Sequence, residues 1–192
     1  MKRVALTILL MSATGLMLQG CVAAVIGAGA GATAKVATDP RTTGTQIDDT
    51  TLNSRIASKL KDNATAFIGS RISSSTYNGN ALLTGQANTD QSEKAEELTR
   101  EVDGVKKVYN QIRIGDPVGV GTITNDSWIT TKVKSQLVMN AQTKARKIKV
   151  VTENSEVFLI GIVTNEEGKA AADVASRVDG VKKVVTIFNY IE

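Results

Sequence analysis

The chain of 192 residues contains no histidine, one cysteine, two prolines and few aromatic residues. Without histidine it cannot form a Ser-His-Asp or Cys-His catalytic centre, or a metal site built on imidazole. The single cysteine, Cys21, excludes an internal disulfide. Aromatic residues make up 4% of the chain, too few for the stacking platforms that bind single-stranded nucleic acid. The sequence therefore predicts neither a metal centre nor a nucleic-acid partner.

Charge and glycine patterns also argue against catalysis. The formal net charge is +4, and it falls to about +2 if an N-terminal segment containing Lys2 and Arg3 is removed. This charge is too small to imply a nucleic-acid partner by itself. Four glutamates lie between residues 93 and 101. We interpret them as a solvated helix face, because nothing nearby indicates the apolar surroundings that raise a carboxyl pKa. No glycines have the spacing of a phosphate-binding loop. The prediction is a non-enzymatic protein without a cofactor.

An internal repeat organises the chain. The heptapeptide Val-Asp-Gly-Val-Lys-Lys-Val occurs at residues 102–108 and again at residues 178–184, an offset of 76. The same offset places Gly85 on Gly161. Further upstream an offset of 77 aligns two apolar helical stripes, Leu52, Ile56 and Leu60 with Ile129, Val133 and Leu137. A match this long predicts two duplicated domains, each of roughly 65 to 75 residues.

Each repeat is expected to run helix, strand, strand, helix, strand, in an α+β fold. In the first repeat, Asp48, Asp49 and Thr50 are candidate helix caps. The expected strands are residues 71–77, residues 81–84 stopping at Gly85, and residues 105–114, with a hairpin turn at Asn78-Gly79 and a second helix over about residues 90–102, capped by Asn88 and Gln91. The helices should pack on one face of a small mixed sheet.

The second repeat repeats this order. Its first helix is expected to begin at Asp126 or Ser127, with a capping box at Thr164 and Glu167 before the second helix. The expected strands are residues 147–152, 156–160 and 181–191. The connection between repeats, residues 115–121, is short, so we expect some contact between the domains.

The N-terminus has the pattern of a secretory signal. Lys2 and Arg3 precede an apolar run, residues 4–18, that is short for a membrane span. Leu-Gln-Gly-Cys at residues 18–21 resembles the bacterial lipobox, which implies a signal peptide over residues 1–20 and acylation of Cys21. The valine that follows Cys21 implies sorting to the outer membrane. An uncleaved signal anchor is the alternative. Residues 21–46 are rich in Ala, Gly and Thr and predict a flexible linker.

Trp128 decides most of the functional argument. Between Trp128 and Lys149 the chain has six basic residues and no acidic one. One interpretation is a half-buried residue packed on the linker or on the first domain. The other is an interfacial anchor, because the indole suits the headgroup level of a membrane and nearby lysines favour an anionic leaflet. In the first repeat Thr51 stands at this position, in a helix that also carries aspartates.

These features together resemble the BON-domain family of bacterial envelope proteins. Both repeats have a glycine after the hairpin strand and a Val-x-Gly-Val helix stop before the last strand. The lipobox, the Thr-Asp-Pro-Arg of residues 38–41 and the run over residues 125–133 are similar to outer-membrane lipoproteins with two such domains. The resemblance implies two tandem BON domains, at residues 47–115 and 116–192. It also implies a lipid anchor facing the periplasm.

The resemblance further implies a function without catalysis, the maintenance of outer-membrane integrity at the division site. It implies that the second domain binds phosphatidylglycerol and cardiolipin through its first helix, and that the protein associates with the β-barrel assembly machinery. The lipid-binding residues it implies are Trp128, Thr131, Lys132, Lys134, Ser135 and Met139. One alternative is a periplasmic interaction scaffold with Trp128 as its protein-contact hot spot. An envelope hydrolase that uses carboxylates is a third possibility, which no specific residue pair supports.

Overall fold

The computed structural model describes residues 43–192, with the elements of the expected α-β-β-α-β order found twice. The first domain consists of α4 (Thr43–Asp62), the 3-10 helix η2 (Ala64–Phe67), β1 (Arg71–Tyr77), β2 (Asn80–Ala87), α5 (Thr89–Arg100) and β3 (Lys107–Ile114). The second consists of α6 (Val120–Met139), the 3-10 helix η3 (Ala145–Lys147), β4 (Ile148–Glu153), β5 (Glu156–Val163), α7 (Asn165–Ser176) and β6 (Lys183–Tyr190). The fold class predicted from the sequence is confirmed.

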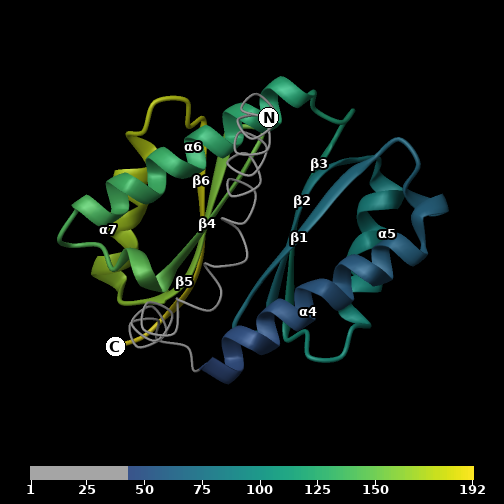
Figure 1. Ribbon diagram of the computed structural model, residues 1–192, viewed down its shortest axis with the longest axis horizontal. Helices are drawn as coiled ribbons and strands as arrows, with labels where there is room; N and C mark the ends of the chain where they lie inside the picture. Colours follow the sequence, from purple (N-terminus) through teal and green to yellow (C-terminus); the bar gives the residue numbers. More distant parts are fainter. Residues whose placement is uncertain (1–42) are drawn as a thin grey trace, which may run out of the picture. The chain divides into compact units, whose positions relative to one another are not determined.

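Each domain has a three-stranded mixed sheet with two helices packed on it. The strand orders are β1-β2-β3 and β4-β5-β6. In each sheet the first two strands pair antiparallel and the last two pair parallel. Figure 1 shows α4 and α5 lying along the first sheet, and α6 and α7 along the second. The crossover helix of each domain, α5 or α7, connects the two parallel strands.

The helix-facing side of each sheet forms the core that the apolar stripes predicted. In the first domain Leu52 and Ile56 of α4 pack against Ala81 and Leu83 of β2. The corresponding members of the second core are Ile129, Val133, Leu137, Val157 and Leu159. All of these side chains are buried because they lie at helical spacing on α4 and α6 and at alternate positions on β2 and β5.

The opposite faces of the two sheets contact each other. Tyr77 and Leu82 of the first domain form one buried cluster with Phe158, Ile160 and Ile187 of the second. This third cluster removes from water the apolar sheet faces that carry no helix. A domain of this size has no further layer of its own to cover that face. The short connection predicted contact between the domains, but it did not predict which faces of the sheets form that contact.

Polar links at the rim of this contact are pseudo-symmetric. The Arg71 guanidinium lies 2.5 Å from a carboxylate oxygen of Glu153, and the Tyr77 hydroxyl donates to the Lys147 carbonyl at 2.9 Å. At the offset of 76, Arg71 corresponds to Lys147 and Tyr77 to Glu153. The two links therefore join equivalent places on the duplicated domains, as in an isologous dimer interface.

Both capping predictions for the crossover helices are confirmed. Asn88 caps α5 by accepting from the Gln91 backbone, while the Gln91 side chain accepts from the Asn88 backbone. Thr164 and Glu167 make the same reciprocal pair at the start of α7. Each box satisfies amide groups that would lack an intrahelical partner.

The expected starts of the first helices were wrong. The chain is already helical at Thr43, the first described residue, which lies inside the segment predicted as linker, and α6 begins at Val120, with Gly119 at its N-cap. Neither Asp49 nor Asp126 caps a helix, because both lie within helices and are buried. The first turns escaped prediction because their apolar residues do not continue the core stripe.

Asp49 and Asp126 instead hold the hairpin turns. Asn78 and Gly79 have positive φ, as a type I′ turn requires, and Asp49 accepts from their backbone N–H groups at 2.7 and 2.8 Å. Asp126 accepts from the backbone N–H groups of the second turn at the same two distances; that turn is Asn154-Ser155. Each aspartate thus ties the first helix of its domain to the tip of the hairpin.

Gly85 does not stop the second strand as expected. The strand β2 continues through Gly85 to Ala87, and β5 continues through Gly161 to Val163. A Cβ on Gly85, whose φ is +121°, would lie 1.9 Å from the Arg71 carbonyl oxygen. A Cβ on Gly161 would lie 2.5 Å from the Lys147 carbonyl oxygen. Both glycines permit close approach of the neighbouring strand.

The predicted signal peptide and Cys21 lie outside the described residues, as does the linker before Thr43. Within residues 43–192, no helix has the length and apolar character needed to cross a membrane.

Candidate functional site

One face of α6 points away from the core and is uncharged. Trp128 is 62% exposed, and the other large apolar side chains of this face, Val120, Val138 and Met139, are at least as exposed. Thr131 and Ser135 lie between them and are exposed as well. We call these six residues the α6 outer stripe. At 3.6 residues per turn all six lie on one side of the helix, opposite Ile129, Val133 and Leu137.

Basic residues flank the stripe, and no carboxylate lies on it. The helix α6 contains one acidic residue, Asp126, which is buried against the hairpin turn. By helical geometry Lys132 and Lys134 lie on opposite sides of the stripe. The exposed surface of α6 is therefore apolar at its centre and cationic at its edges.

Lys132 is held in place rather than free in water. Its ammonium donates to the backbone carbonyl of Asp179, just beyond the end of α7, at 2.6 Å. The same nitrogen is 6.0 Å from the centre of the Trp128 ring, at the limit of a cation–π contact. Lys134 is exposed, so it is the lysine more available to an outside anion.

A cleft of about 440 Å³ separates α6 from the end of α7. Four of the predicted site residues line it: Trp128, Thr131, Lys132 and Ser135. The predicted residues Lys134 and Met139 lie on α6 outside this lining. The structure thus brings the first four together and leaves the other two on the same helix beyond the cleft.

The sequence reasoning missed Arg177, which lines the same cleft from α7. Its guanidinium pairs with Asp173 one turn earlier at 2.8 Å, and its side chain is 76% exposed. The Asp173–Arg177 spacing signals an exposed helix pair. Nothing local in the sequence says that Arg177 faces α6.

The equivalent face of α4 is polar. At the offset of 77, the residues that match Trp128, Thr131, Ser135, Val138 and Met139 are Thr51, Ser54, Ser58, Lys61 and Asp62. All five are exposed, as their counterparts are. The two helices have matching core stripes, so the difference between them lies on the surface.

Two of the three α5 glutamates, Glu96 and Glu97, are engaged in surface ion pairs. Lys94 lies 2.7 Å from Glu97, and this hydrogen bond raises the pKa of Lys94. Arg100 pairs with Glu96 one turn away. Among residues 43–192, no group of three or more acidic, cysteine or histidine side chains is placed to hold a metal ion. The arrangement is that of a solvated helix face.

Comparison with known families decides the class of the chain. The model for the BON domain matches residues 48–116 and again residues 125–190. The chain belongs to the BON-domain family.

Two relatives are similar to this chain over most of their length. The outer membrane lipoprotein DolP of Haemophilus influenzae is 48% identical over 185 residues, which cover 96% of this chain and 95% of the relative. The 21 kDa hemolysin of Actinobacillus pleuropneumoniae is 48% identical over 155 residues, which cover 80% of each chain. The similarity to DolP includes the N-terminal region that carries Cys21 as well as both BON domains.

Proposed function

We propose that this chain is an outer-membrane lipoprotein that docks on anionic phospholipid through the α6 outer stripe and performs no catalysis. The observation that carries the proposal is the exposed, acid-free face of α6 with Trp128 at its centre. In this proposal residues 1–20 are a signal peptide, acylated Cys21 anchors the chain, and the following residues tether the two BON domains.

The chemistry of the stripe suits a membrane interface. A large apolar side chain contributes about 1.5 to 3 kcal/mol when fully buried, and Trp128, Val138 and Met139 can enter the headgroup region together. The indole N–H keeps a polar partner at that depth. Each lysine near an anionic leaflet adds about 1 kcal/mol. A chain already held by acyl groups requires only this modest affinity to stay docked.

The similarity to an outer membrane lipoprotein supports the location. Maintenance of membrane integrity, enrichment at the division site and contact with the β-barrel assembly machinery rest on the family resemblance, and they add no residue to the site. A periplasmic scaffold with Trp128 as its hot spot uses the same exposed surface. Lipid binding distinguishes the two functions.

The test uses the tryptophan itself as the probe, because Trp128 is the only tryptophan in the chain. The chain from residue 22 onward is mixed with vesicles of phosphatidylglycerol and phosphatidylethanolamine, or of phosphatidylcholine alone. We expect a blue shift of the fluorescence with the anionic vesicles only. We also expect Trp128→Glu to lower the affinity measured by vesicle sedimentation by about 30-fold or more.

The matched control is Thr51→Glu, which places the same charge at the equivalent exposed position of α4. It should leave sedimentation unchanged. Equal binding to both kinds of vesicle, or full binding by Trp128→Glu, would contradict lipid docking. If Trp128→Glu instead removed a crosslinked protein partner and vesicle binding was absent, the scaffold function would replace it.

A further inference from the structure

The outer edge of β1 presents main-chain groups in a defined pattern. Among the described residues, β1 pairs only with β2, so its other edge is free. The two-residue turn fixes Tyr77 and Asn80 as a pair that exchanges hydrogen bonds. Hydrogen-bonded and non-hydrogen-bonded residue pairs alternate along an antiparallel ladder. Ile72, Ser74 and Thr76 are in non-hydrogen-bonded pairs, so their N–H and C=O groups point to the free edge.

Two of these three residues lack main-chain partners. The Thr76 carbonyl accepts from the Lys149 ammonium at 3.2 Å. Within residues 43–192, no hydrogen bond engages the main-chain N–H or C=O of Ile72 or Ser74 on this edge. Four adjacent donors and acceptors are therefore available to another extended backbone.

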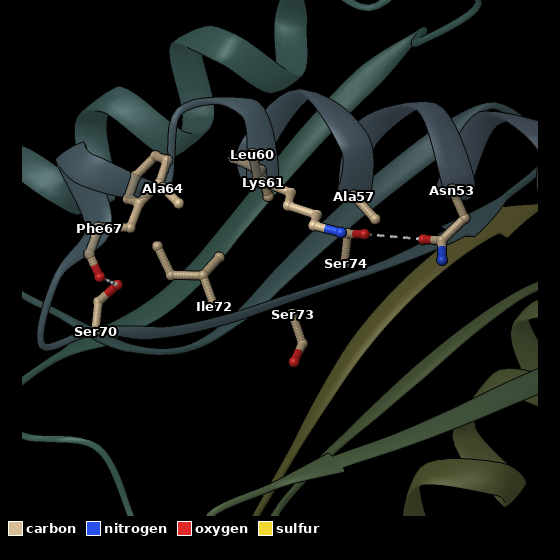
Figure 2. Close-up of a pocket in the computed structure, with 10 residues that line it drawn as sticks. All are labelled: Asn53, Ala57, Leu60, Lys61, Ala64, Phe67, Ser70, Ile72, Ser73 and Ser74. Atoms are coloured by element: carbon tan, nitrogen blue, oxygen red, sulfur yellow. Dashed lines mark hydrogen bonds between the residues drawn. The ribbon is translucent and has the colours of Figure 1, made fainter.

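A cleft of about 510 Å³ lies along this edge, between α4 and β1. Figure 2 shows Leu60, Phe67 and Ile72 on its walls, with the Ser74 hydroxyl directed to Asn53. That hydroxyl donates to the Asn53 side-chain oxygen at 3.0 Å. The lining is thus apolar beside η2 and polar towards the hairpin end.

Small side chains leave this cleft open. At the domain offsets, Ala57 and Ser74 line the cleft where the second domain has Lys134 and Val150. Val150 is buried, whereas Ser74 is half-buried. The larger residues of the second domain supply side-chain volume that the first domain lacks at these two places.

The edges of β3 and β4 differ from that of β1. After Arg71, β1 has no charged residue of its own, whereas β4 has Lys149 at the position of Ser73, with its ammonium on the Thr76 carbonyl of β1. On β3, the Asn110 side chain accepts from the Ile112 N–H and so covers part of the edge. The β6 strand is also uncharged after Lys183. It is the cleft together with the free amides that singles out β1.

Lys61 adds a charge preference. It lines the cleft from α4 and is exposed, and no carboxylate among the described residues forms an ion pair with it. Its neighbour Lys59 is paired with Glu101. An acidic side chain on a bound segment would therefore find an unpaired cation at this rim.

We propose that the edge of β1 and the adjoining cleft bind an extended peptide segment of a partner protein. The segment adds a strand to the first sheet through Ile72 and Ser74, places an apolar side chain between Leu60 and Phe67, and sets an acidic side chain against Lys61. The site lies in the first domain and does not depend on the docking of α6.

The probe is a synthetic hexapeptide with one aspartate followed by alternating valine and threonine. It is titrated into the isotope-labelled chain from residue 22 onward, and amide resonances and hydrogen exchange are recorded by NMR. We expect the Ile72 and Ser74 amides to shift and to exchange about tenfold more slowly at saturation. A peptide N-methylated at alternate residues, which cannot pair as a strand, should cause neither change.

Two variants keep the test independent of folding. Ser73→Lys introduces on the exposed edge the residue that β4 carries, and should weaken binding about tenfold. Ser74→Val places the second domain's residue in the cleft and should weaken binding too. Thr186→Lys on the β6 edge is the matched control and should change nothing. Unperturbed Ile72 and Ser74 amides at millimolar peptide, equal shifts along β6, or full binding by a folded Ser73→Lys variant would each overturn the proposal.

Discussion

The two domains have the same framework and different surfaces. Both use a buried aspartate to hold a type I′ turn, a capping box to begin the crossover helix and a glycine at the close approach of two strands. On the outside, α6 carries Trp128, Val138 and Met139 where α4 carries Thr51, Lys61 and Asp62. At the cleft beside β1 the first domain has the distinctive surface, because its smaller side chains leave that cleft open.

Duplication within one chain separates the needs of folding from those of binding. Positions that match between the domains are those whose contacts the fold requires, such as Asp49 and Asp126 under their turns. Positions that differ lie on exposed faces that the fold leaves free. Each domain is thus a control for the other, and each proposal assigns a separate surface to a separate domain.

The largest expected effect breaks the shared framework. Gly85→Ala would place a Cβ 1.9 Å from the Arg71 carbonyl oxygen at a φ of +121°, so we expect a loss of about 3 kcal/mol or more in unfolding free energy. Gly161→Ala meets its neighbour at 2.5 Å without the unfavourable φ, and should cost less. Urea denaturation followed by circular dichroism measures both variants. Equal losses would show that neither the closer contact nor the positive φ at Gly85 adds to the loss of stability.

Much of this framework could be predicted from the sequence because the repeat tests every assignment twice. The stripes of Leu52 and Ile129 define both cores, and the boxes at Asn88 and Thr164 mark both crossover helices. The helix starts could not be predicted. Asp126 has the chemistry of a cap, and only the folded hairpin supplies the two turn amides that it binds instead.

The candidate site was predictable along one helix and not across two. Helical periodicity separates Trp128, Thr131 and Ser135 from the core positions of α6. It says nothing of Arg177 across the cleft or of the Asp179 carbonyl that holds Lys132. Those neighbours depend on how α7 packs on α6, which is a tertiary contact without a local signal. The contacting faces of the two sheets have the same origin.

A transplant sharpens the comparison of α4 with α6. In a Trp128→Glu background, Thr51→Trp with Asp62→Met gives the exposed face of α4 two of the four apolar side chains of the α6 outer stripe. We expect this combination to recover about tenfold in affinity for phosphatidylglycerol vesicles, because an exposed indole beside basic residues suffices for interfacial binding. Vesicle sedimentation measures the change.

The control for the transplant is Thr51→Ser with Asp62→Asn, which alters the same positions without adding apolar surface. If the tryptophan-bearing α4 recovered no more affinity than this control, the composition of the stripe would be insufficient. The cleft beside α7, with Lys132 and Arg177, would then be a necessary part of the lipid site.

The smallest expected effect on stability comes from an ion pair between the two domains, Arg113 with Glu156. Arg113 of β3 donates to both carboxylate oxygens of Glu156 of β5, at 3.1 and 2.5 Å. The hydrogen bond from Arg113 lowers the pKa of Glu156 below its ordinary value of 4.5. Stability from this pair is therefore present above pH 4.5 and is lost as the pH falls through the lower pKa of the folded state.

Replacement of Glu156 tests whether this link joins the domains. Because the pair is partly exposed, Glu156→Gln should cost no more than about 1 kcal/mol at neutral pH and should flatten the decline in unfolding free energy below pH 4.5. Glu93→Gln on exposed α5 is the control and should leave that decline unchanged. Urea titrations at several pH values measure both variants. An unaltered acid slope in Glu156→Gln would mean that the sheet faces around Tyr77 and Phe158 hold the domains together without help from this pair.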